Sequence, residues 1–279
     1  MKPVVAVIGA GAMGSAVGKR LVEHGLEVMT PLEGRSEASR KRARDAGMTA
    51  VGSEQVAASD LVLSIIPPGN ALPVAEKLAP MLARNNKRPI YVDCNAVNAV
   101  TAERIGGAVT GAGVPFVDAG IIGGPPAAGY KGPAFYASGS EAPRFATLND
   151  YGLDVRVIDG PVGAASAMKM SYAGITKGFT ALGAVMMLAA TRAGTAEALH
   201  RELSQSQPEL LAWLTRAVPR MYSKAYRWIA EMEEIAGFVQ EDAAGHQIFE
   251  GAADLYRRLA ADYEGANTET GALTKFVKG

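Results

Sequence analysis

The chain has 279 residues, 48% of them hydrophobic, which is enough to bury one large core or two modest ones. Its 28 basic and 28 acidic residues cancel, so no overall field favours nucleic acid, an acidic membrane surface or a polyanionic substrate. The single cysteine, Cys94, excludes an internal disulfide framework and any site built from several thiolates. We therefore expect a small-molecule partner and a reducing, cytoplasmic compartment.

The first half of the chain alternates short apolar runs of β character with helical stretches. The predicted strands are Val4–Ile8, Glu27–Thr30, Leu61–Ile65, Ile90–Val92, Phe116–Ile121 and Val155–Ile158. The predicted helices between them are Met13–His24, Glu37–Ala46, Ala71–Ala83 and Ala102–Ala112. Several strands are apolar without alternation, as in a parallel sheet that is covered on both faces. Right-handed crossovers then predict a doubly wound α/β sheet of the Rossmann type.

Strand signals stop after Gly160, and residues 163–193 are rich in Ala, Met and Leu. Further apolar residues recur near helical spacing, so the sequence predicts a Rossmann domain, 1–160, followed by an all-helical domain, 161–279. The uncharged segment Gly178–Thr191 is shorter than the roughly 18 residues of a membrane-spanning helix, which predicts a buried helix. The polar tail from Glu264 onward is expected to be loosely ordered.

A glycine-rich segment, Gly9–Gly14, follows the first predicted strand and opens the first predicted helix. In this G-x-G-x-x-G pattern the first glycine permits a tight turn, the second lets a pyrophosphate approach the backbone, and the third lets helix and strand pack closely. The helix N-terminus adds free N–H groups and partial positive charge. This context predicts dinucleotide binding rather than a merely tight turn. The expected cofactor contacts are Gly9, Gly11, Ala12, Met13 and Gly14.

The segment after the second strand decides between NAD and NADP. Glu33 stands where an acid would accept a hydrogen bond from the ribose 2′-OH, whereas Arg35 and Ser36 would bind a 2′-phosphate. A guanidinium beside a hydroxyl at a predicted helix N-terminus favours NADP as the cofactor over NAD. The alternative is that Arg35 is a solvated loop residue.

Four further segments carry a family resemblance: Leu63–Pro68, Asp93–Asn95, Asp118–Pro126, and Gly160–Gly163 with Lys169 beyond it. Their order and spacing resemble the β-hydroxyacid dehydrogenase and 6-phosphogluconate dehydrogenase superfamily, which includes 3-hydroxyisobutyrate dehydrogenases and imine reductases. The match covers roughly the first 190 residues. The later helices resemble a less characterised branch with a 6-phosphogluconate-dehydrogenase-like C-terminal domain.

The resemblance implies roles for individual residues. Ile66 and Pro67 would lie in a loop that runs alongside the nicotinamide ribose, and Asn95 would help to hold cofactor and substrate. The loop with Ile122, Gly123 and Gly124 would bind substrate.

Two positions depart from the family pattern. Ile122 replaces the serine that binds a substrate carboxylate, although backbone N–H groups at Gly123 and Gly124 could still bind an oxyanion. Ala173 replaces the asparagine one helical turn after the catalytic lysine, and Tyr172 precedes it. Either the phenol stands in for the missing amide, or the pocket accepts a different substrate.

The resemblance also implies that Lys169 is the catalytic acid or base on a long interdomain helix. Partial desolvation in an apolar helix is expected to lower a lysine pKa, so that it accepts a proton in alcohol oxidation and donates one in carbonyl reduction. The alternative is a lysine whose head extends from a core helix to water. Lys177 is a weaker rival, and Tyr172 could be a second catalytic group or a core residue.

Together these features predict an NADP-dependent dehydrogenase or reductase that acts on a small hydroxy or oxo compound, with a hydroxy acid favoured. The alternatives are an imine reductase on the same scaffold and a non-enzymatic NADP-sensing protein. The three histidines lack metal-binding spacing, so no metal site is expected. The long apolar helix and the family resemblance predict a homodimer. The balanced charge and the short uncharged segment predict no nucleic-acid or membrane partner.

Overall fold

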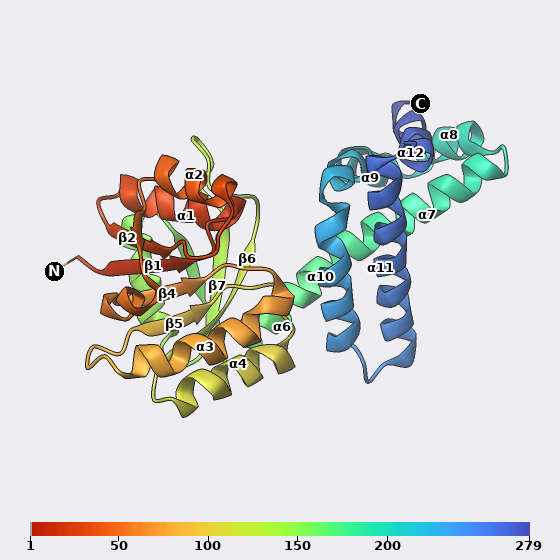
Figure 1. Ribbon diagram of the computed structural model, residues 1–279. Helices are drawn as coiled ribbons and strands as arrows, with labels where there is room; N and C mark the ends of the chain where they lie inside the picture. The colour runs from red at the N-terminus through yellow and green to blue at the C-terminus, as the bar shows by residue number, and fades with distance from the viewer. Residues whose placement is uncertain (1) are drawn as a thin grey trace. The chain divides into compact units, whose positions relative to one another are not determined.

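The computed structural model describes residues 2–279, and the first part of the chain is built on one eight-stranded sheet (Figure 1). Its strands are β1 (Val4–Ile8), β2 (Glu27–Pro31), β3 (Thr49–Val51), β4 (Leu61–Ser64), β5 (Ile90–Asp93), β6 (Phe116–Ile122), β7 (Ala134–Ser138) and β8 (Asp154–Val157). The spatial order is β3-β2-β1-β4-β5-β6-β7-β8. Neighbouring strands from β3 to β6 are parallel, whereas β7 is antiparallel to β6 and parallel to β8. The strand order reverses at β1 and β4, where open α/β sheets bind ligands.

Helices cover both faces of this sheet, as the apolar strands predict. They are α1 (Ala12–Glu23), α2 (Glu37–Asp45), α3 (Ala71–Ala83) and α4 (Ala99–Gly111). Helices α1 and α2 lie on one face and α3 and α4 on the other (Figure 1). Alternate residues of β1 point to opposite faces, so Val5 and Val7 pack with α1, and Ala6 and Ile8 belong to the core with α3 and α4.

Short elements complete this part of the chain. They are the 3₁₀ segments η1 (Ser53–Ala58), η2 (Pro68–Asn70) and η3 (Ala146–Tyr151), and the short helix α5 (Ala142–Phe145). All six predicted strands and all four predicted helices are present, so the Rossmann prediction is confirmed. The sequence pattern missed β3 and β7.

The remainder of the chain is all-helical, as predicted. Helix α6 (Ala164–Ala173) continues through a π-helical segment, Gly174–Gly178, into α7 (Phe179–Arg192). The later elements are α8 (Ala196–Ser206), α9 (Pro208–Met221), η5 (Tyr222–Lys224), α10 (Ala225–Phe238), α11 (Ala243–Glu264) and α12 (Thr268–Lys278). By contacts the chain forms two compact units, which divide between Met170 and Ser171 within α6.

The expectation of a loosely ordered tail was wrong, because α12 occupies it. The Asp262 carboxylate accepts the backbone N–H groups of Thr268, Glu269 and Thr270 at 2.8, 3.2 and 2.8 Å, which caps the start of the helix. Leu273 and Phe276 are buried on its inner face.

The expectation that the apolar helix is too short to span a membrane was also wrong. The π-helical segment joins α6 and α7 into one helix of 29 residues, Ala164–Arg192, which is long and apolar enough to cross a membrane by length and composition. A single such helix is weak evidence for a membrane span, because core helices pass the same test. Its burial is one-sided, with Ile175, Leu182 and Met186 exposed, so the prediction of a buried helix holds for only one face.

Candidate active site

The glycine segment between β1 and α1 has the geometry that a dinucleotide requires. Gly9 has φ +102°, and a Cβ there would lie 2.5 Å from the carbonyl oxygen of Ile65. A Cβ on Gly14 would collide with the carbonyl oxygen of Gly9. A Cβ on Gly11, in contrast, would meet nothing within 4 Å. Gly9 and Gly14 are therefore packing requirements, while the space over Gly11 can admit a pyrophosphate.

The N-terminus of α1 is electrostatically suited to phosphate. Gly11 is the N-cap, no side chain caps the helix, and its first turn contains no acidic residue. The Ser15 hydroxyl donates backward to the carbonyl oxygen of Gly11 at 2.7 Å, leaving the helix N-terminus without a competing side-chain acceptor. Ala12 is exposed and Met13 half-buried at this end. These residues fit the pyrophosphate of NAD(P).

The residues predicted to choose the cofactor lie between β2 and α2. Glu33 accepts a hydrogen bond from the Ser53 hydroxyl at 3.0 Å, which draws its carboxylate toward the start of η1. Arg35 is exposed, and Ser36 is the N-cap of α2, where its hydroxyl oxygen accepts the backbone N–H of Ser39 at 3.3 Å. Sequence reasoning missed Arg42, whose Nε donates to the carbonyl oxygen of Ala10 at 3.0 Å.

Asn95 connects the ends of β4 and β5. Its Oδ1 accepts the backbone N–H of Ile66 at 2.7 Å, and its Nδ2 donates to the Ser64 hydroxyl at 3.0 Å and to an Asp93 carboxylate oxygen. Asn95 is buried, Ile66 is half-buried and Pro67 is exposed. The Asn95 amide therefore fixes the loop that carries Ile66 and Pro67. Direct contact of Asn95 with cofactor or substrate stays a prediction.

Strand β6 holds helix α6 through Asp118. One oxygen of this buried carboxylate accepts the backbone N–H groups of Gly163 and Ser166, at 2.9 and 3.0 Å, and the Ser138 hydroxyl at 3.1 Å. Its other oxygen accepts the Ser166 hydroxyl at 2.6 Å. Asp118 thus satisfies backbone donors at the start of α6 and ties that helix to β6 and β7. The sequence offered only its place in the family motif as a signal.

Lys169 follows one turn later on α6 and packs against Gly120 of the same strand. A Cβ on Gly120 would lie 2.9 Å from the Lys169 Cβ and 3.1 Å from the carbonyl oxygen of Ala165. Only a glycine permits this close approach of helix and strand. Lys169 is buried, with 9% relative exposure. Its positive charge lowers the pKa of Asp93. The structure therefore sets the predicted catalytic lysine between the carboxyl-end regions of β5 and β6.

Asp93 is a fully buried carboxyl group in this cluster. Burial raises its pKa, hydrogen bonding from Asn95 lowers it, the charge of Asp118 raises it and the charge of Lys169 lowers it, with a result of about 7. Its Oδ2 has no hydrogen-bond partner among the described residues. Asp93 can therefore carry a proton close to neutral pH.

We expect this carboxyl group to make stability fall as pH rises. The folded chain keeps the Asp93 proton up to about pH 7, whereas the unfolded chain releases it near 3.8, so each step upward between these values favours unfolding. The free energy of unfolding of the wild type should therefore fall by on the order of a few kcal/mol between about pH 5 and pH 8, and Asp93→Asn should abolish this fall. Urea unfolding at both pH values measures this, and an equal loss in the wild type and the variant would rule it out.

The predicted substrate loop starts at the end of β6. Ile122 is half-buried, and Gly123 and Gly124 are exposed beyond it. Gly123 has φ +125°, a conformation that favours glycine. Because β1, β4, β5 and β6 are parallel, this loop leaves the same edge of the sheet as Gly9 and Asn95.

The other catalytic candidates differ in their surroundings. Tyr172 has 48% relative exposure, and its carbonyl oxygen accepts the Thr176 hydroxyl. Lys177 forms an ion pair with Glu231 and lies 5.1 Å from the centre of the Trp228 ring, so its ammonium group is already engaged. Residues 2–279 contain no group of three or more His, Cys, Asp or Glu placed to hold a metal ion.

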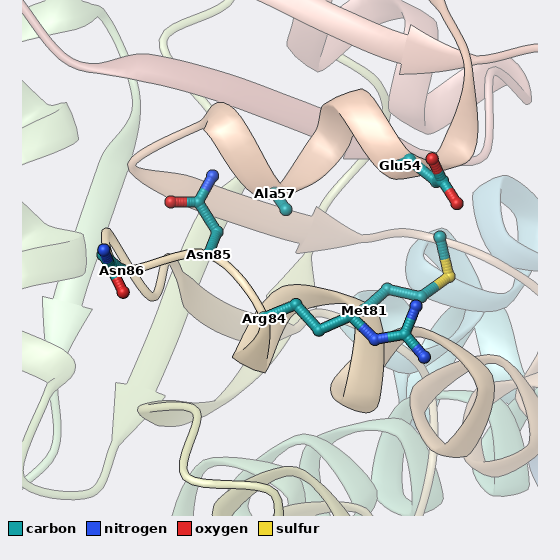
Figure 2. A pocket seen from close by; sticks show the side chains of 6 residues that line it. All are labelled: Glu54, Ala57, Met81, Arg84, Asn85 and Asn86. Carbon is teal, nitrogen blue, oxygen red and sulfur yellow. The ribbon is translucent and has the colours of Figure 1, made fainter.

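A surface hollow of about 470 Å³ lies elsewhere in the same unit (Figure 2). It is lined by Glu54 and Ala57 of η1, Met81 at the end of α3, and Arg84, Asn85 and Asn86 beyond that helix. None of the predicted site residues lines it. We do not assign the active site to this hollow.

Comparison with known proteins gives two family matches. Residues 4–150 match the NAD binding domain of 6-phosphogluconate dehydrogenase, and residues 190–259 match a domain of unknown function, DUF1932. An uncharacterized 28.5 kDa protein of Methanothermus fervidus is 28% identical over 238 residues, which are 84% of this chain and 90% of that protein.

Solved structures extend the comparison. A conserved protein of unknown function with structural similarity to 3-hydroxyacid dehydrogenases is 31% identical, with 92% of this chain and 98% of that chain covered and a TM-score of 0.69. A Mycobacterium tuberculosis 3-hydroxyisobutyrate dehydrogenase, solved with L-serine, shares the fold at 20% identity, with coverage of 94% and 95% and a TM-score of 0.69.

Imine reductases have the same fold. The imine reductase of Myxococcus stipitatus, solved as a V8 variant with NAD+ and also with NADP+, is 19% and 18% identical in the two structures, with 99% of this chain and 100% of each of those chains covered and TM-scores of 0.55 and 0.57. Complexes with NAD+ and with NADP+ therefore both occur among these structures. The glycine segment, the strand order and the 4–150 match agree, and the chain belongs to the family of the NAD binding domain of 6-phosphogluconate dehydrogenase.

Proposed function

We propose that this chain is an NADP-dependent oxidoreductase that transfers a hydride between nicotinamide and a small hydroxy acid or its aldehyde or keto counterpart. The observation that carries the proposal is the burial of Lys169 against Gly120, on the strand that leads into the Gly123-Gly124 loop. A screen of hydroxy acids, aldehydes and cyclic imines with each nicotinamide, followed by absorbance, tests it. Turnover of hydroxy acids with NADP supports the proposal, and turnover of imines alone contradicts it.

In this mechanism the bound nicotinamide supplies the hydride chemistry. Lys169 Nζ takes the hydroxyl proton during oxidation and returns it during reduction. Backbone N–H groups at Gly123 and Gly124 would hold a substrate oxyanion without needing the serine that Ile122 replaces. Asp118 acts through the start of α6, which it fastens to β6.

NADP preference is proposed to depend on Arg35. Replacing Arg35 with alanine should raise the Michaelis constant for NADPH by about tenfold and leave that for NADH nearly unchanged, because one charge-assisted contact to the 2′-phosphate is lost. Arg44→Ala is the matched control, since Arg44 lies on α2 and pairs with Glu37 at 2.7 Å. Steady-state kinetics with both cofactors measures the effect. Equal changes for NADPH and NADH would show that Arg35 does not discriminate.

An imine reductase is the second candidate, and the hydrocarbon side chain of Ile122 favours it. A loop without the serine hydroxyl loses one group that recognises a carboxylate, which an imine substrate does not need. The buried Lys169 favours the dehydrogenase, because its amino group can take a proton from a hydroxyl and return one to a carbonyl oxygen. The substrate screen above separates the two.

We also propose a homodimer formed through the π-helical segment Gly174–Gly178 and α7. Ile175, Leu182 and Met186 repeat at spacings of seven and four, which places them on one helix face, and they are 73%, 59% and 56% exposed. A second copy of the chain would remove this apolar face from water. Sedimentation at micromolar concentration should give twice the chain mass. A monomer there would contradict the proposal.

A further inference from the structure

The side chain of Arg20, on α1, holds a loop more than a hundred residues further along the chain. Its Nη1 donates to the carbonyl oxygens of Lys131 and Gly132, each at 3.1 Å. Its Nη2 donates to the carbonyl oxygens of Ala127 and Tyr130 at 3.1 and 2.8 Å. All four acceptors are main-chain atoms, so the contact depends on the conformation of the loop rather than on its side chains.

One planar guanidinium can bind four carbonyls only if they converge on it. The segment Ala127–Gly132 makes this possible by turning back on itself, with the Tyr130 N–H donating to the carbonyl oxygen of Ala127 at 3.1 Å. Residues 127–131 are exposed, so the loop has little apolar burial to hold its shape. The charge-assisted hydrogen bonds from the planar Arg20 guanidinium therefore contribute much of what holds the loop in this conformation.

The restrained segment reaches the predicted substrate-binding glycines through Tyr130. A Cβ placed on Gly123 would collide with the Tyr130 hydroxyl and lie 3.1 Å from the Pro133 Cβ. The phenol therefore lies against one side of Gly123, which stays exposed. Movement of Tyr130 would take this neighbour away from Gly123, a glycine whose φ of +125° few other residues adopt and whose backbone has many other conformations open to it.

We propose that Arg20 is a positioning residue for substrate binding. By holding Ala127–Gly132 it keeps Tyr130 against Gly123, and so keeps the Gly123 and Gly124 N–H groups oriented toward the substrate. This inference rests on the proposed function, in which these N–H groups bind the substrate oxyanion. Preorganised donors lower the free-energy cost of binding, so the loss of Arg20 should weaken substrate binding more than cofactor binding.

The test compares Arg20→Ala and Arg20→Lys with Lys19→Ala, a change at the next residue of α1, where an exposed lysine pairs with Glu23 at 3.8 Å. Arg20→Ala should raise the substrate Michaelis constant by about tenfold, with the NADPH constant within about twofold of wild type. Arg20→Lys should restore part of the loss, because an ammonium group reaches fewer carbonyls than the guanidinium fork. Lys19→Ala should behave as wild type.

A second measurement is independent of activity. Trypsin cleavage after Lys131, identified by fragment mass, should be at least about tenfold faster in Arg20→Ala than in Lys19→Ala, because the freed loop can enter the protease. If Arg20→Ala is cleaved no faster than Lys19→Ala, Arg20 does not hold the loop. If Arg20→Ala is cleaved faster but its substrate Michaelis constant is unchanged, Arg20 does not position the substrate-binding glycines. If the wild type turns over no substrate, the proposed function fails, the positioning role falls with it, and cleavage alone decides whether Arg20 holds the loop.

Discussion

Lys169→Ala should lower turnover by about 10²–10⁴-fold and leave the Michaelis constant for NADPH near its wild-type value. General acid–base catalysis contributes a factor of this size, and the dinucleotide is expected to contact the glycine segment rather than this side chain. The buried position of Lys169 beside Gly120 is what permits a direct role in proton transfer. Steady-state kinetics on the best substrate from the screen provides the measurement.

A volume control separates chemistry from packing. Lys169→Met keeps an unbranched side chain of similar length in the buried site, so it should fold like wild type and still lose turnover as Lys169→Ala does. Thermal melting of both variants checks the fold. Turnover within a few-fold of wild type in either variant would remove Lys169 from the mechanism. The proton would then come from Tyr172 or water, and the imine-reductase proposal would lead.

The second large effect is expected at Asp118. Asp118→Ala should lower the free energy of unfolding by about 3–5 kcal/mol, because buried donors of Gly163, Ser166 and Ser138 would lose their acceptor. Urea unfolding measures the change. Turnover should fall as well, since the start of the helix that bears Lys169 is no longer held to β6.

The control for Asp118 is an exposed ion pair. Asp154→Ala breaks the pair with Arg156, whose N–O distance is 2.7 Å, and should cost no more than about 1 kcal/mol. A loss at Asp118 no larger than the loss at Asp154 would mean that the buried network does not hold α6 in place.

Most of the sheet could be predicted because its strands are short apolar runs bounded by glycine, proline or polar residues. The exceptions have physical reasons. Strand β3 has only three residues, and β7 follows a glycine and proline loop, so neither gives a long periodic signal. The polar composition of the tail hid α12, whose cap depends on Asp262 and whose buried side chains depend on tertiary packing.

In the candidate site too, some residues could be predicted from local sequence and others could not. The glycine segment Gly9–Gly14 could be predicted because strand, turn and helix are adjacent in the chain. The apolar helix around Lys169 gives only a weak signal, and its catalytic role is predicted mainly by the family resemblance, since nothing near it in sequence indicates that Gly120 would lie against it. The roles of Arg20 and Asp118 depend on contacts across more than forty residues, which local patterns do not encode.

A crystal structure of the chain with NADPH and a hydroxy acid tests the proposed site most directly. We expect the pyrophosphate on the backbone of Gly9–Gly14, the 2′-phosphate at Arg35, and the hydroxyl of the acid within hydrogen-bond reach of Lys169 Nζ. Density that places NADPH away from the glycine segment, or the hydroxy acid away from Lys169, would contradict the proposed chemistry.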